Sequence, residues 1–170
     1  VPPRKGRRHA LRLIRDVLAF RPKGRGTDIP GALDYAARLL AHRGIMFLLS
    51  DFAPRGEATQ AQQEQWEKTL RLVSRRHDVI GVAISDPAEL QLPDIGFVAV
   101  EDPETGEYAF VDTSGSAVRE VFGVALARER RETRRLFRRL GVDESEVRTD
   151  VPYVRPLLAF FHRRERQRRR

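Results

Sequence analysis

The first half of the chain alternates between two patterns of apolar residues, one typical of helices and the other of strands. Residues 9–20 carry apolar side chains at every third or fourth position, which predicts an amphipathic helix. The apolar run at 45–50 is typical of a strand buried on both faces of a sheet, and the segment 77–85 is expected to be another buried strand. The segments 28–42 and 59–76 are expected to be helices. Strands that alternate with helices favour a parallel sheet joined by crossover connections.

Polar residues at the start of two predicted helices support this assignment. Asp28 stands just before Ile29 and Pro30, in the position of a residue that caps a helix. Thr59 is followed three residues later by Gln62, which is the spacing of a capping box. Each helix is therefore expected to begin close to these residues.

The second half of the chain departs from the alternation. Residues 96–113 contain two short strand-like runs about a Pro-Glu-Thr-Gly turn, which predicts an inserted β-hairpin. A long helix is expected at 116–140, ended by Gly141. Residues 146–150 are expected to form a short last strand, and the basic tail at 163–170 is expected to fray.

The last two predicted helices carry a charged stretch and a set of spaced apolar residues, respectively. The stretch "RERRETRR" at 128–135 lies in the middle of the long helix and is expected to be a solvated face. A terminal helix before the basic tail is marked by Val154, Leu157, Leu158 and Phe161.

Length and composition indicate one folded domain over residues 1–170. A chain of 170 residues with 41% hydrophobic and 33% charged residues can bury a sizeable core. Its longest apolar run is far shorter than the ~20 residues that a spanning helix needs, so a soluble, cytoplasmic protein is expected. The absence of cysteine excludes disulfide frameworks, thiolate zinc sites and cysteine nucleophiles.

The net charge of +8 is unevenly distributed. Residues 1–25 hold nine Lys or Arg and one acidic residue, residues 26–118 hold seven and fifteen, and residues 119–170 hold sixteen and eight. Basic blocks of this kind occur in nucleic-acid-binding proteins, because neutralising phosphates drives their affinity. The blocks here contain 29 arginines against three lysines and lack interleaved aromatic residues for base stacking, so nucleic-acid binding is not the favoured function.

Catalytic motifs are absent from the sequence. It contains neither a Gly-x-Ser-x-Gly elbow nor a phosphate-binding loop that ends in Gly-Lys-Ser or Gly-Lys-Thr. The four histidines are scattered without the spacing of a helical metal pair. A non-enzymatic function is therefore expected, although carboxylates alone leave a divalent-metal hydrolase open.

Two pairs of polar residues suggest a metal site. Thr27 and Asp28 precede a predicted helix, and Ser50 and Asp51 end a predicted strand. Ligands of open parallel sheets bind beyond the carboxyl ends of the strands. Hydroxyl and carboxylate oxygens suit Mg²⁺, with Mn²⁺ as the near substitute. On spacing alone, the alternative that Asp28 only caps its helix and Asp51 only begins a turn stays equally open.

Several motifs together resemble a known family. They are "PPRKGRRHALRLIRDVL", "GTDIPGAL", "FLLSDF", "RRHDVIGVAISDPAELQLPDIG", "EDPETGE", "VDT" and "TDVPYVRPLLAFFHRR". In this order they are similar to the C-terminal two-thirds of the bacterial domain-of-unknown-function family 58. The resemblance implies a von Willebrand factor A-like fold, a three-layer, doubly wound, Rossmann-like sheet with a metal-ion-dependent adhesion site. It also implies a MoxR-type AAA ATPase as partner.

The same resemblance implies roles for individual residues. Thr27 corresponds to the threonine ligand of the second metal loop and Asp51 to the aspartate of the third, with Asp28 and Ser50 flanking them. The first metal loop, Asp-x-Ser-x-Ser after a buried strand, has no counterpart before Thr27. The literal match at 112–116 follows the return arm of the hairpin, which is the wrong place in the order. The chain is thus expected to lack the N-terminal strands of the sheet, and with them part of the Mg²⁺ or Mn²⁺ site.

The function expected from these patterns is a metal-dependent protein-interaction module that works with the ATPase in chaperone-like assembly or maturation. A basic nucleic-acid-binding adaptor and a scaffold with a vestigial metal site are the alternatives. Binding that falls steeply with salt and ignores the metal would distinguish the adaptor.

Overall fold

The computed structural model describes residues 1–2, 4–21, 26–52, 59–101, 106 and 108–168. The chain divides into two compact units. The first comprises Val1–Thr27 with Glu101–Glu107, and the second comprises Asp28–Val100 with Tyr108–Arg170.

The first unit contains α1 (Arg7–Ala19), which confirms the helix predicted at 9–20. The helix is amphipathic, as its sequence pattern predicts, but none of its residues is buried. Its apolar side chains at Leu11, Ile14, Val17 and Leu18 are all exposed.

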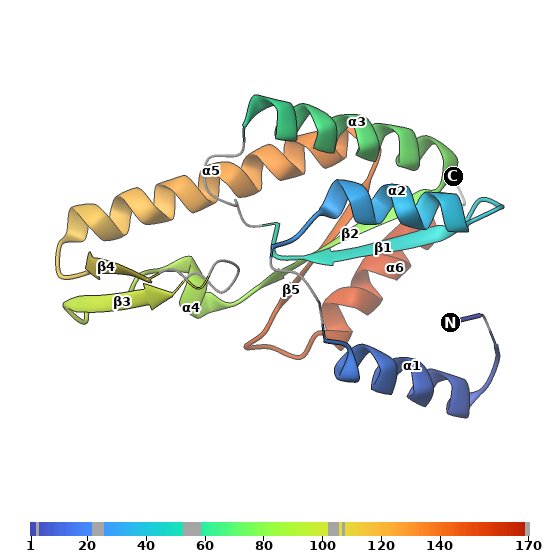
Figure 1. Cartoon of the computed structure of the whole chain (residues 1–170), viewed down its shortest axis with the longest axis horizontal. Coiled ribbons are helices and arrows are strands. Elements are labelled where there is room, and N and C mark those ends of the chain that lie inside the picture. Colours follow the sequence, from blue (N-terminus) through green and yellow to red (C-terminus); the bar gives the residue numbers. More distant parts are fainter. Residues whose placement is uncertain (3, 22–25, 53–58, 102–105, 107, 169–170) are drawn as a thin grey trace. The chain divides into compact units, whose positions relative to one another are not determined.

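The second unit is built on a three-stranded parallel sheet, which confirms the predicted α/β class (Figure 1). Its strands are β1 (Ile45–Ser50), β2 (Asp78–Ser85) and β5 (Asp143–Arg148), in the order β1-β2-β5. The register aligns Ser50 with Ala83 and Ala83 with Glu146, so the carboxyl ends of the three strands lie at one edge of the sheet. The last strand begins earlier than the 146–150 predicted from the sequence.

Helices pack on both faces of this sheet (Figure 1). One face is covered by α2 (Ile29–Leu39), α3 (Gln60–Arg76) and α5 (Ser116–Leu140), whose buried side chains meet Met46, Val79 and Val142 in the larger core. The other face is covered by α6 (Val154–Arg168), which contributes Phe160 to a smaller core with Ile80 and Val82.

Local signals in the sequence set the helix boundaries. Thr59 and Gln62 form the predicted capping box at the start of α3. Gly141 ends α5 in the left-handed conformation at φ 68°, and the Val142 N–H donates to the Phe137 carbonyl across the turn at 2.9 Å. The prediction that Gly141 ends the long helix is confirmed.

The prediction that the run at 45–50 is buried on both faces is wrong. β1 forms one edge of the described sheet, and its side chains alternate between buried and exposed positions. Ile45, Phe47 and Leu49 are 56%, 50% and 62% exposed. α6 packs over β2 and β5, and the described contact with Phe47 is an edge-on ring contact from Phe161 at 6.1 Å. A continuous apolar run fits a central strand as well as an edge strand, so the sequence pattern could not make this distinction.

The basic tail, predicted to fray over 163–170, is helical through 168, and residues 169–170 lie outside the described part of the chain. α6 continues through Arg168, and Arg164, only 13% exposed, bridges the amino ends of two strands. Its guanidinium lies 2.6 Å from an oxygen of Asp78 and 2.6 Å from an oxygen of Asp143. These two charge-assisted contacts hold the terminal helix on the sheet.

The two strands of the predicted hairpin are confirmed as a sheet of β3 (Phe97–Glu101) and β4 (Tyr108–Asp112), while most of its predicted turn lies outside the described residues. It is preceded by a short helix that the sequence patterns miss, α4 (Pro87–Leu90), which Asp86 caps through the Ala88 N–H. Buried Thr113 fixes the base of the hairpin, because its hydroxyl donates to the Gly96 carbonyl at 2.8 Å.

Candidate functional site at the carboxyl edge of the sheet

Asp51 stands directly after β1, at the sheet edge where parallel α/β proteins bind ligands. Its carboxylate is exposed and accepts a hydrogen bond from the Ser50 hydroxyl at 3.2 Å. The same hydroxyl accepts from the Phe52 N–H at 3.1 Å. The predicted pair Ser50 and Asp51 is therefore brought together by one short network.

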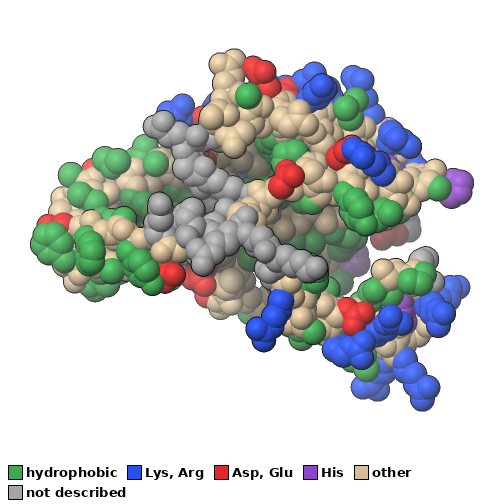
Figure 2. All heavy atoms as spheres, in the orientation of Figure 1, with side chains coloured by type: hydrophobic (Ala, Val, Ile, Leu, Met, Phe, Trp, Pro, Cys, Tyr) green, Lys and Arg blue, Asp and Glu red, His purple; other side chains and the backbone are tan. Residues whose placement is uncertain are grey.

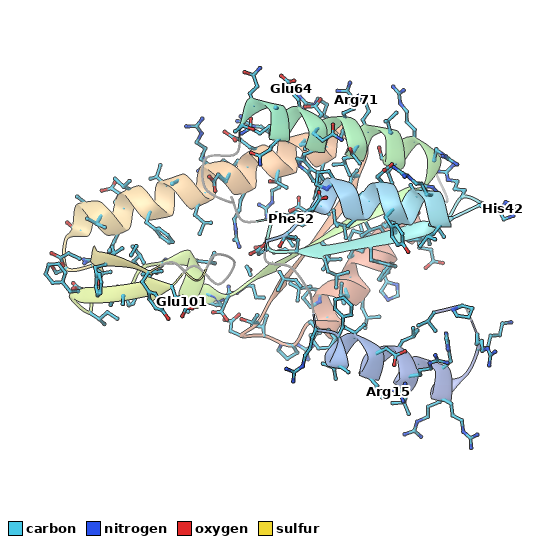
Figure 3. All side chains as sticks on the ribbon, in the orientation of Figure 1. Arg15, His42, Phe52, Glu64, Arg71 and Glu101 are labelled. Carbon is cyan, nitrogen blue, oxygen red and sulfur yellow. The ribbon has the colours of Figure 1, made fainter. Side chains whose placement is uncertain are left out.

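Phe52 explains how this turn is held (Figure 3). Its φ of 49° lies in the left-handed region, which is an outlier for a bulky residue. The strain is offset by packing, because the Phe52 ring meets the Phe137 ring edge-on at 5.2 Å and lies against the larger core. Strained backbone of this kind clusters at functional sites. The partly buried ring fixes the loop and leaves Asp51 on the surface.

Asp28 has the capping role that the sequence predicts. Its carboxylate accepts from the Gly31 N–H at 2.9 Å at the start of α2. A Cβ at Gly31 would come within 2.1 Å of that carboxylate, so a larger residue there would displace the cap. Thr27 is the last residue of the first unit, whereas Asp28, Ser50 and Asp51 belong to the second. A metal-binding role for Asp28 and Thr27 stays a prediction.

A small pocket adjoins Asp51, and the sequence patterns missed the residues from α5 and β5 that line it. Its wall is formed by Asp51, Phe52, Ala83, Arg130, Thr133, Arg134, Glu144 and Glu146. Arg134 bridges Glu144 at 3.2 Å and Glu146 at 2.6 Å. Arg130 lies 3.7 Å from Glu146. None of residues 128–135 is buried, which agrees with the predicted solvated face, but Arg130 and Arg134 on that stretch also pair with glutamates of β5.

The donor set around Asp51 supplies only part of a magnesium site. Mg²⁺ takes six oxygen ligands, of which one or two are usually carboxylates and several are waters. Asp51 and Ser50 offer suitable hard oxygens, but Glu144 and Glu146 are engaged by Arg134. In the part of the chain that the structure describes, no group of three or more His, Asp or Glu side chains could hold a metal by itself. Further ligands have to come from hydroxyls, water or other residues.

The literal Asp-x-Ser-x-Ser match at 112–116 is a turn between the hairpin and α5. Asp112 accepts from both the N–H and the hydroxyl of Ser114, at 2.9 Å and 2.6 Å. These bonds, the hydroxyl first, hold the pKa of Asp112 below its ordinary value. Thr113 is fully buried against the hairpin. This geometry fits the interpretation of the segment as a local turn.

Ser85 and Asp86, at the carboxyl end of the central strand, are further polar residues that sequence reasoning missed. Ser85 is 2% exposed, and its hydroxyl has no hydrogen-bond partner among the described residues. Asp86 accepts from the Thr149 hydroxyl at 2.7 Å, which ties the end of β2 to the residue after β5. Ser85-Asp86 repeats the Ser50-Asp51 pattern at the end of a predicted strand, and that repetition is the signal that could have found them.

The Asp86 contact predicts a pH dependence of folding. Hydrogen bonds from the Thr149 hydroxyl and then the Ala88 N–H lower the pKa of Asp86. Because this pKa is lower in the folded chain than in the unfolded one, the ionised Asp86 stabilises the fold at pH values above the ordinary carboxyl pKa of about 4. This stabilisation is lost as the pH falls through the lowered pKa. The stability difference between the native chain and Asp86→Asn is therefore expected to be constant near neutral pH and to shrink below about pH 4.

Urea unfolding across a pH series would measure this difference, with Asp34→Asn, which removes a carboxylate from the exposed side of α2, as the charge control. If the stability difference between the native chain and Asp86→Asn stays the same from neutral to acidic pH, the stabilising role of the hydrogen bonds to Asp86 is contradicted.

The family model described as "Protein of unknown function DUF58" matches residues 1–132. The chain belongs to the DUF58 family. An uncharacterized protein of Mycobacterium avium is 30% identical over 168 residues, which cover 98% of this DUF58 chain and 94% of the relative. Uncharacterized proteins of Mycobacterium tuberculosis and Mycobacterium bovis are 29% identical over 98% of this chain and 50% of their own length. The DUF58 chain thus spans about half the length of these last relatives.

No solved structure matches the DUF58 chain. Among the residues that the structure describes, no helix is both long and apolar enough to cross a bilayer.

Proposed function

We propose that this DUF58 chain is a non-enzymatic protein-interaction module of von Willebrand factor A-like fold. Its metal-ion-dependent adhesion-type site would lie at the carboxyl end of β1. The observation that carries the proposal is Asp51, an exposed carboxylate at the ligand-binding edge of a parallel sheet, followed by a strained and anchored residue. The resemblance of "GTDIPGAL" and "FLLSDF" to the second and third metal loops of the family supports the same position for the proposed site.

Thr27 and Asp51 are the proposed ligands of Mg²⁺ or Mn²⁺, and Asp28 and Ser50 flank them. The cation would supply an open coordination position for an oxygen of the partner. Asp51 would contribute its carboxylate directly or through a water, and Ser50 would orient that carboxylate through its hydroxyl. Arg130 lines the same pocket, where it pairs with Glu146 at 3.7 Å.

The proposed partner is a MoxR-type AAA ATPase, with which the module would act in chaperone-like assembly or maturation in the cytoplasm. The resemblance to DUF58 proteins, which are commonly associated with such ATPases, supports this choice. The second unit, with its capped helices and two cores, provides the rigid support that a binding site of this kind needs.

A magnesium-dependent pull-down of the ATPase by the full natural protein tests the proposal. We expect Thr27→Ala and Asp51→Ala each to reduce capture by about tenfold or more. A tenfold loss of affinity corresponds to about 1.4 kcal/mol of binding free energy. Asp34→Ala, which removes an exposed aspartate from α2, should leave capture unchanged. Chelation of the metal should have the same effect as Asp51→Ala.

Capture that is unaffected by both substitutions and by chelation would reject the proposal. If capture instead falls steeply with salt, ignores the metal and extends to nucleic acid, the adaptor alternative is favoured.

A further inference from the structure

Thr133 on α5 is a polar residue of the Asp51 pocket for which the fold gives no role. It lines the same pocket as Asp51 and is half-buried. Within the described part of the chain its hydroxyl makes no hydrogen bond, not even to the carbonyl one turn earlier, which threonines inside helices often use. The hydroxyl is therefore available to whatever the pocket holds.

The packing of α5 fixes where this hydroxyl lies. Thr133 stands four residues before Phe137, so the two side chains share one face of the helix. The Phe137 ring contacts the Phe52 ring at 5.2 Å, and Phe52 directly follows Asp51. The ion pairs of Arg134, the next residue along the helix, tie α5 to β5. Contacts to the turn after β1 and to β5 thus hold Thr133 at the pocket from two sides.

The charges of the pocket wall favour a cation. The two arginines of the wall, Arg130 and Arg134, are paired with its two glutamates. Asp51 is the remaining charged residue among those that line the pocket, and it makes the net charge of this wall negative. On the face shown in Figure 2, Lys and Arg side chains gather over α2 and α3, neither of which lines the pocket. A cation in the pocket is therefore attracted by Asp51, whereas an anion is repelled.

The size of the pocket limits what can enter it. Its volume of about 20 Å³ holds a single water-sized body, which fits a metal ion or one water of its shell and excludes an organic ligand. Mg²⁺ is usually held by one or two carboxylates and keeps several waters. Ser or Thr hydroxyls also serve as Mg²⁺ ligands in proteins. One carboxylate and one hydroxyl on opposite elements are in line with these preferences.

We propose that Thr133 is a further residue of the cation site at Asp51. Its hydroxyl contacts the cation directly or through one bound water, and so brings an oxygen from α5 to the carboxyl end of β1. This inference rests on the proposed function, because it presupposes a cation at Asp51. Thr133 supplies one of the oxygens that Asp51 and Ser50 leave to be found, and the cation then joins the helix layer to β1.

Replacing the hydroxyl with a methyl group tests the role of Thr133. In the full natural protein, Thr133→Val is expected to raise the Mg²⁺ dissociation constant, measured by titration calorimetry, by about tenfold, as is typical when a group that orients a metal ligand is lost. Thr133→Ser keeps the hydroxyl and is expected to restore the native value. Ser74→Ala, which removes a hydroxyl from α3 outside the pocket, should have no effect.

The melting temperature without metal separates binding from folding. Because the Thr133 hydroxyl bonds to no described residue and valine has the same shape and a similar helix propensity, Thr133→Val is expected to leave this temperature unchanged. If Thr133→Val lowers it and the weaker Mg²⁺ binding follows from that loss of stability, Thr133 has a structural role and the proposal is overturned.

The titration also separates this inference from the proposed function. If Asp51→Ala abolishes Mg²⁺ binding and Thr133→Val leaves it unchanged, the role of Thr133 is overturned while the site at Asp51 stands. If the full natural protein binds no Mg²⁺, the site and the role of Thr133 are both overturned.

A paramagnetic measurement reports the contact without any substitution of Thr133. Mn²⁺ shares the oxygen ligands of Mg²⁺ and broadens the nuclear magnetic resonance signals of nearby nuclei. In the full natural protein, the signal of the Thr133 methyl group is expected to disappear on Mn²⁺ addition and to persist in Asp51→Ala. A Thr133 signal that stays sharp in the native sequence at saturating Mn²⁺ would overturn the proposal.

Discussion

Replacing Phe137 with alanine is expected to lower the free energy of unfolding by about 3–5 kcal/mol. Phe137 is 1% exposed and joins the helix layer to the sheet. Its ring meets the Phe52 ring at 5.2 Å and the Trp66 ring at 6.4 Å, both edge-on. Removing the ring leaves a cavity at the centre of the larger core and frees the strained turn that follows Asp51.

Gly81 shows how closely this ring approaches the sheet. A Cβ on Gly81 would lie 2.4 Å from a ring carbon of Phe137, so Gly81→Ala is expected to destabilise the fold by about 1–3 kcal/mol through overpacking. The expected destabilisation by Gly81→Ala arises from the contact with Phe137. In a Phe137→Leu background, where that edge of the ring is absent, most of the Gly81→Ala cost should disappear.

Urea unfolding of the two single variants and the double variant measures this coupling as a double-mutant cycle. Leu72→Ala, at an exposed position of α3, is the control and should change stability by no more than about 0.5 kcal/mol. Costs of Gly81→Ala and Phe137→Leu that simply add would contradict the packing described for this core.

The sequence predicted the elements of the fold well because their signals are local. Asp28 and Thr59 begin helices through side-chain bonds to N–H groups three residues away, and Gly141 ends one through its own backbone conformation. Such signals need no knowledge of the rest of the chain. The parallel arrangement followed from the alternation of the elements.

Features that depend on distant parts of the chain were missed. Whether β1 is a central or an edge strand depends on its neighbours, and its apolar run fits both. The order of the basic tail depends on Arg164 reaching Asp78, 86 positions earlier. Arg134 pairs with Glu144 and Glu146 only because α5 lies over β5.

The candidate site was predicted in part for the same reason. Asp51 could be placed from the strand before it, and the structure brings it next to Ser50. The pocket beside it depends on residues of α5 and β5 that lie far along the chain. The alternation of Glu144 and Glu146 along β5 was a usable signal, because residues two apart in a strand share a face.

Magnesium is expected to stabilise the full natural protein through Asp51. At a concentration of about 100 times the dissociation constant, a ligand that binds only the folded state adds about 2.7 kcal/mol. For a domain of this size that corresponds to a rise in melting temperature of roughly 5–10 °C. Asp51→Ala is expected to remove most of the rise, because it deletes the carboxylate ligand. Asp34→Ala removes a carboxylate of equal charge from α2 and is expected to keep the rise.

A magnesium titration followed by thermal unfolding, on the full natural protein with its native sequence and with each of these two substitutions, is the most direct test of the metal-dependent site. The account predicts a rise that saturates in the native protein and in Asp34→Ala and is lost in Asp51→Ala. A rise of equal size in all three proteins, or no rise in the native protein, would contradict a metal site at the carboxyl end of β1.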